Sequence, residues 1–124
     1  MKVMLAMAVT AALGTGAAFA DCVYPAAPDK IPDGATAILE EMLAGQKAVK
    51  AYQQAINEYT ACIDKDLDAQ IAKAGDKLKP EQKTDMMRIE AQKHNAAVDQ
   101  AQAVADRFNE QVKVYKARTA DKKG

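Results

Sequence analysis

The sequence is poor in the residues on which most enzyme sites depend. It contains no Ser and no Trp, one histidine, His94, and two widely separated cysteines, Cys22 and Cys62. The lack of Ser excludes a serine nucleophile, and the spacing of the cysteines excludes a Cys-x-x-Cys thiol site. The sequence also lacks a glycine-rich cofactor loop. We therefore expect no catalytic activity and no cofactor.

An excess of charge of one sign is also missing. The 17 Lys and Arg residues balance the 17 Asp and Glu residues. Nucleic acids and anionic membranes attract proteins through an accumulated positive field, so we expect neither as a partner. Large apolar residues are scarce as well, because much of the apolar content is Ala. The core is therefore expected to be thin, and stability has to come partly from elsewhere.

The one long apolar run lies at the N-terminus. Lys2 precedes the run Val3–Leu13, and small residues occupy positions 18 and 20. This run is too short to span a bilayer, but the whole pattern is typical of a signal peptide at residues 1–20. We predict cleavage after Ala20, a periplasmic protein and no integral membrane segment after cleavage. A lipid anchor on Cys22 is disfavoured, because an acidic residue precedes it.

The remaining sequence divides into an arm, two helices and a tail. Residues 21–35 contain three of the four prolines, which exclude a regular helix and favour an extended arm. Helices are predicted over residues 36–74 and 80–118, with Gly75 ending the first and Pro80 beginning the second. Residues 119–124 are predicted to be a disordered tail. Two long helices joined by a short turn predict an all-α antiparallel hairpin over residues 36–118.

Each predicted helix carries an apolar stripe. Apolar or small residues recur at alternating spacings of four and three, as in a coiled-coil seam. The stripe of the first helix consists of Ile38, Met42, Gly45, Val49, Tyr52, Ile56, Tyr59 and Ile63, and that of the second consists of Met87, Ala91, His94, Val98, Ala101, Ala105, Phe108, Val112 and Tyr115. A turn centred near residue 77 places Phe108 opposite Gly45, and Val98 opposite Ile56. We interpret both stripes as core.

Two cysteines in an exported chain predict a disulfide between Cys22 and Cys62. Cys62 lies roughly 39 Å along the predicted first helix. The segment from Cys22 to Thr36 reaches about 46 Å when extended, so the arm can fold back far enough. By the chain-entropy model such a bond stabilises the fold by about 4 kcal/mol. A bond between two chains is the alternative.

His94 offers the one candidate metal site. Glu90 lies one turn before it, and the expected register brings Asp64 near. Imidazole and carboxylate groups are ordinary ligands of divalent metals, so Asp64, Glu90 and His94 are candidate ligands. The favoured alternative is an imidazole at the edge of the core, hydrogen-bonded to Glu90 or to a Tyr hydroxyl.

Several short motifs along the chain carry a resemblance to a known group. They are Asp21-Cys22, Ile31-Pro32-Asp33-Gly34, Glu41-Met42, Val49-Lys50-Ala51-Tyr52, Tyr59 with Cys62, Pro80-Glu81-Gln82, Lys93 to Val98 and Arg107-Phe108-Asn109. With these motifs the chain resembles a group of short, uncharacterised exported proteins of Gram-negative bacteria. The resemblance implies a periplasmic helical protein with a two-cysteine staple and assigns no site residue.

A second, weaker likeness concerns the start of the second helix. Leu78-Lys79-Pro80-Glu81-Gln82 is similar to the Leu-Thr-x-x-Gln motif of periplasmic stress chaperones, although Lys79 replaces the Thr and a second copy is missing. The same residues are also an ordinary helix start.

Three functions follow from these patterns. The first is a periplasmic structural or interaction protein that binds an unknown protein partner. The alternatives are a holdase-like chaperone, which requires exposed apolar side chains, and a weak divalent-metal binder that uses Glu90 and His94. A homodimer is also possible by sequence, because an Ala-rich helix pair can pack face to face into a four-helix assembly.

Overall fold

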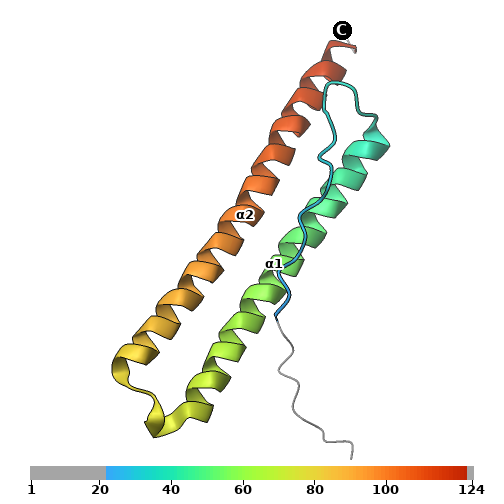
Figure 1. Cartoon of the computed structure of the whole chain (residues 1–124). Coiled ribbons are helices and arrows are strands. Elements are labelled where there is room, and N and C mark those ends of the chain that lie inside the picture. Colours follow the sequence, from blue (N-terminus) through green and yellow to red (C-terminus); the bar gives the residue numbers. More distant parts are fainter. Residues whose placement is uncertain (1–21, 123–124) are drawn as a thin grey trace, which may run out of the picture.

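The chain is built from two long helices. The computed structural model describes residues 22–122, in which α1 spans Leu39–Ala74, α2 spans Pro80–Asp121 and a short 3-10 helix, η1, spans Gly75–Lys77. Within these residues the structure contains no strand, so the predicted all-α class is confirmed. The helices lie side by side and run in opposite directions (Figure 1). The predicted signal peptide, residues 1–20, lies outside the described residues.

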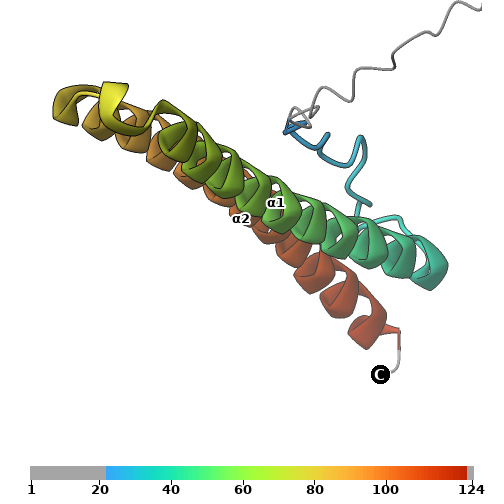
Figure 2. The ribbon, with the colours of Figure 1, turned by 90° about the horizontal axis from the view of Figure 1, so that it is seen from below.

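Residues 22–38, which we call the arm, run beside the helices. The arm starts near the middle of α1, extends toward the end of the molecule that carries the C-terminus, and turns back there into α1 (Figure 1). Viewed from below, it lies to one side of the helix pair (Figure 2). Its prolines fix the backbone and lack an N–H, which accounts for its irregular, extended course. None of the helices within residues 22–122 is long and apolar enough to cross a membrane.

The first helix begins at Leu39 rather than at the predicted Thr36. The main-chain carbonyl of Asp33 accepts hydrogen bonds from the N–H groups of Thr36 and Ala37, at 3.1 and 2.7 Å. The side chain of Asp33 accepts another from the N–H of Ala35, at 2.9 Å. These bonds hold the residues after Asp33 in a turn, so regular helical hydrogen bonding starts only beyond it.

The break between the helices falls where the sequence predicts it. Gly75 caps the end of α1, with φ 51° and ψ −131°. Pro80 occupies the first turn of α2, where its missing N–H costs no hydrogen bond. The side chain of Gln82 accepts a hydrogen bond from the N–H of Lys79 at 3.0 Å and so caps the new helix.

The second helix continues past its predicted end. It runs to Asp121 rather than to Arg118, so the prediction of a disordered tail over 119–124 is wrong for residues 119–121. No Gly or Pro interrupts the sequence there, and the Thr119 hydroxyl donates to the carbonyl one turn earlier, at 2.9 Å. Residues 123–124 lie outside the described part of the chain.

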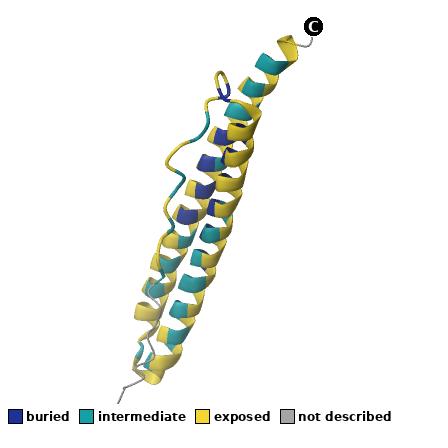
Figure 3. Ribbon diagram, turned by 90° about the vertical axis from the view of Figure 1, so that its right-hand side faces the viewer, coloured by how far each residue is buried: buried dark blue, intermediate teal, exposed yellow. Residues whose placement is uncertain are grey.

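The core lies in one half of the helix pair. Its buried apolar residues are Ala37, Met42, Val49, Tyr52, Ile56, Ala97, Ala101, Val104 and Phe108. They occupy the part that the arm runs beside, α1 up to residue 60 and α2 from residue 97, which we call the arm half. The rest of the pair, residues 61–96, is the turn half, in which every residue is half-buried or exposed (Figure 3).

The predicted stripe of α1 is largely correct, and that of α2 is correct at Ala101 and Phe108 but wrong at Met87 and Val98. Met42 to Ile56 are buried as predicted, although Ile38 is exposed. In α2 the predicted Val98 is 45% exposed, and Ala97 is fully buried in its place. Residues 97 and 98 differ by one step around the helix, and the smaller Ala allows a closer approach of the two helices. Spacing alone does not distinguish them.

Candidate functional site

The arm lies in the groove between the two helices. On one side of it, a crevice is lined by arm residues 30–33 and by Glu41, Gly45 and Ala48 of α1, among others. On the other side, a crevice is lined by Arg107, Glu110 and Gln111 of α2 and by five arm residues, which are Pro28, Asp29, Ile31, Pro32 and Asp33. The arm therefore covers the groove over the arm half and acts as a third layer on the helix pair.

A disulfide attaches the start of the arm to α1. Cys22 is bonded to Cys62 of the same chain, with their Cα atoms 5.7 Å apart. Next to it, the rings of Tyr24 and Tyr59 pack edge to face, with centroids 5.1 Å apart. Burial and the neighbouring Tyr24 hydroxyl raise the pKa of Tyr52, which lies in the core below. The disulfide thus marks the point at which the covered part of the groove begins.

Two glycines allow the arm to approach the helices closely. A Cβ added to Gly45 of α1 lies 2.6 Å from Pro32 Cγ in the arm and 3.0 Å from Phe108 Cε2 in α2. The predicted pairing of Gly45 with Phe108 is therefore confirmed. A Cβ added to Gly34 of the arm lies 2.0 Å from the backbone oxygen of Gln111. Neither position leaves room for a side chain.

Polar side chains of α2 hold the turn at the end of the arm. Gln111 Oε1 accepts a hydrogen bond from the N–H of Gly34 at 2.8 Å. Arg118 Nε donates to the carbonyl of Gly34 at 3.1 Å, and its Nη2 donates to the carbonyl of Ala37. Arg118 also stacks over the ring of Tyr115, 5.3 Å from its centroid. Sequence reasoning missed Gln111 and Arg118, because nothing in the spacing shows which surface side chains reach the arm.

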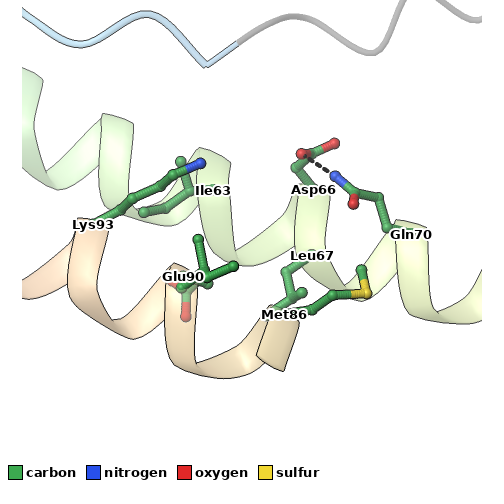
Figure 4. Close-up of a pocket in the computed structure, with 8 residues that line it drawn as sticks. Ile63, Asp66, Leu67, Gln70, Met86, Glu90 and Lys93 are labelled. Atoms are coloured by element: carbon green, nitrogen blue, oxygen red, sulfur yellow. Dashed lines mark hydrogen bonds between the residues drawn. The ribbon is translucent and has the colours of Figure 1, made fainter. Parts of the chain in front are cut away.

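Beyond Cys62 the groove continues without the arm. A cavity of about 240 Å³ opens there between the two helices of the turn half. Ile63, Asp66, Leu67 and Gln70 of α1 and Met86, Ile89, Glu90 and Lys93 of α2 line it. Figure 4 shows Leu67 of α1 and Met86 of α2 between the two helices, while Gln70 donates a hydrogen bond to Asp66 at 2.7 Å on the α1 rim. The cavity has apolar walls and a charged rim.

Glu90 is the unusual polar group of this cavity. Its Oε1 is buried and accepts no hydrogen bond from any residue between 22 and 122. The carboxyl of Asp64 on α1 interacts with it, and this contact, followed by burial, raises the pKa of Glu90 above its ordinary 4.5. Asp68 adds repulsion, while His94 acts in the opposite direction. The site therefore holds a pair of facing carboxyl groups.

The candidate metal ligands are only partly brought together. Glu90 of α2 interacts electrostatically with Asp64 across the helix pair and with His94 one turn later in α2. No three Asp, Glu, His or Cys side chains of the described chain are arranged to hold a metal ion. Asp64, Glu90 and His94 therefore do not form a three-ligand metal site.

Most residues of the cavity were not predicted from the sequence. Ile63 and Glu90 were singled out, but Leu67, Met86 and Lys93 were not. A signal was present, since Ile63, Leu67 and Gln70 recur at helical spacing, and so do Met86, Ile89 and Lys93. Whether such a stripe is core or open surface depends on how far the arm extends.

Comparisons place no known protein beside this one. No family model, no curated protein and no solved structure matches the chain. The resemblance to short exported helical proteins therefore remains a prediction.

Proposed function

We propose that this protein is an exported, periplasmic interaction module that binds a protein partner in the open half of its groove. In this proposal the chain is a non-catalytic helical hairpin, and the arm is held on it by the disulfide. The observation that carries the proposal is the unequal filling of one continuous groove. The arm covers the arm half, whereas the turn half presents Ile63, Leu67 and Met86 around an open cavity.

The physical chemistry of the turn half supports binding rather than a purely structural role. A pair of helices buries little apolar area by itself. In the arm half, the arm adds a third layer that buries more of it. No segment within residues 22–122 adds such a layer to the turn half, so apolar side chains there stay in contact with water. Covering them gains roughly 25 cal/mol per Å² of apolar surface. A partner that completes the layer is favoured for the same reason as the arm.

The disulfide supports the export part of the proposal. Disulfides persist in oxidising compartments such as the bacterial periplasm and are rare in the cytosol. The Cys22–Cys62 bond is therefore compatible with the signal peptide predicted at residues 1–20.

Photocrosslinking in intact cells tests this function. Leu67, in the cavity, is replaced by the photoreactive amino acid p-benzoylphenylalanine, and a matched control carries it at the exposed Gln54 of α1. We expect one discrete adduct from position 67, absent at position 54 and lost when Ile63→Asp is added. Equal labelling at both positions, or none at either, contradicts the proposal.

A holdase-like chaperone is the second candidate, because large apolar side chains are exposed. They are Val23, Tyr24, Ile38, Leu39, Leu43, Met87, Ile89, Val98 and Val114. A holdase uses such side chains to contact unfolded clients of many sequences, although singly scattered apolar residues are also normal on protein surfaces. In the crosslinking experiment a holdase gives a broad smear of adducts, and the purified protein suppresses aggregation of a heated client. Failure to protect any client dismisses this candidate.

A further inference from the structure

The open half of the groove has a definite length and cross-section. It runs along α1 from Cys62 to Ala74, which is about 18 Å at the rise of a helix. An extended backbone covers that distance with about six residues. The arm shows that this groove accepts an extended segment, since it lies between the same two helices on the other side of Cys62. The natural occupant of the open half is therefore a strand-like segment in line with the arm.

The charges around the cavity indicate what this segment carries. Asp66 and Glu90 line the cavity, and Asp64 and Asp68 act on Glu90 from α1. Lys93 is the one cation among the described residues that line the cavity. His94 lies beside Glu90. The buried Oε1 of Glu90 accepts no hydrogen bond from the described residues. A positive charge at the rim lies close to Asp66 and Glu90 and offsets the repulsion between the carboxyl groups of Glu90 and Asp64.

We propose that the open half of the groove binds an extended segment of another protein, about six residues long, in which apolar side chains flank one Lys or Arg. The apolar side chains lie against Ile63, Leu67 and Met86, and the basic side chain lies at the rim close to Asp66 and Glu90. This inference rests on the proposed interaction function and adds the chemistry of the partner.

Two synthetic peptides test it. The first probe is Val-Leu-Lys-Leu-Val-Pro with blocked ends and a fluorescent label, and the second has Glu in place of Lys. Binding to the oxidised mature chain is followed by fluorescence polarisation. We expect the Lys peptide to bind about tenfold or more tightly than the Glu peptide, the effect of one charge-assisted hydrogen bond.

Variants of the protein identify the side chain that interacts with the charged residue of the peptide. Glu90→Gln keeps the shape of the side chain and is expected to reduce the preference for Lys to less than about twofold, because its amide lacks the negative charge. The matched control, Glu58→Gln, removes an exposed carboxylate of α1 and is expected to keep the full preference. Thermal unfolding checks that both variants are folded. The preference is also expected to weaken as the pH falls and Glu90 takes up its proton.

The outcomes separate this inference from the function on which it rests. Equal binding of the two peptides, or an unchanged preference for the Lys peptide in Glu90→Gln, shows that the segment needs no basic residue. Either result overturns this inference but not the proposed interaction function. Binding of neither peptide also overturns the inference, and the adduct at position 67 then decides the interaction function by itself. If light scattering shows a dimer that Leu67→Asp dissociates, the open half of the groove binds a second copy of this chain. That result also overturns the inference.

Discussion

At the scale of single residues, the fold depends on a few positions where the arm touches the helices. Gly34 is the tightest of them, because an added Cβ lies 2.0 Å from a backbone oxygen of α2. Backbone atoms cannot rotate away as a flexible side chain does, so the arm has to move. Gly75 is a useful contrast, since its added Cβ meets nothing within 4 Å.

We predict that Gly34→Ala lowers the free energy of unfolding by about 2 kcal/mol or more, through overpacking. Gly75→Ala is expected to cost about 1–3 kcal/mol from backbone strain alone, because L-residues rarely adopt φ 51° with ψ −131°. Urea unfolding of the two variants beside the parent measures both values. A Gly34→Ala variant that is as stable as the parent contradicts the close packing of the arm on α2.

Glu90 gives a prediction with a defined pH dependence. Its pKa in the folded protein is raised above 4.5, chiefly by its contact with Asp64, then by burial and Asp68, and is lowered by His94. Asp66 and Lys93 line the same cavity. The folded state therefore holds the Glu90 proton more tightly than the unfolded chain does. The stabilisation from this proton is complete below the unfolded pKa and is lost as the pH rises through the folded pKa.

Glu90→Gln is accordingly expected to raise the free energy of unfolding near pH 7, by about 0.3–1 kcal/mol for a partly solvated charge contact. The difference from the parent shrinks as the pH is lowered toward 4, because the parent then carries the proton as well. Thermal unfolding across this pH range measures it. A variant that is less stable than the parent at pH 7 is inconsistent with repulsion between the carboxyl groups.

At the scale of elements, the arm acts as the third layer that two helices need. The Cys22–Cys62 bond closes a long loop and keeps this layer in place in a chain with few large apolar residues. By the chain-entropy model the bond contributes about 4 kcal/mol, a large part of the stability of a small domain.

Replacement of both cysteines by Ala is therefore predicted to lower the free energy of unfolding by about 4 kcal/mol. Chemical reduction of the parent serves as the control and is expected to have the same effect. Guanidinium unfolding followed by circular dichroism measures both. If the reduced protein is as stable as the oxidised one, the arm does not stabilise the helix pair.

The elements show what the sequence can and cannot predict. The two helices, their break at Gly75 and Pro80, and the disulfide follow from local signals and from reach, so they were predicted. The stripe of α2 was predicted correctly at Ala101 and Phe108 but wrongly at Val98, because Ala97 and Val98 both fit the spacing and packing decides between them. The cavity was missed, since it exists only because the arm covers the groove up to Cys62 and not beyond.

At the scale of the whole molecule, the two halves of the helix pair differ in how they are covered. The arm half contains every buried apolar residue of the described chain, and the turn half contains the open cavity (Figure 3). Local stability follows buried contacts, so the halves are expected to open with different free energies. This difference is what leaves the turn half available to a partner.

Amide hydrogen exchange of the oxidised protein, followed by mass spectrometry, tests this claim most directly. The account predicts slow exchange in residues 42–60 and 97–112 and faster exchange in residues 63–74 and 82–93, in the same two helices. Reduction of the disulfide is expected to bring the exchange of the arm half close to that of the turn half. Uniform protection along both helices, unaffected by reduction, contradicts the account.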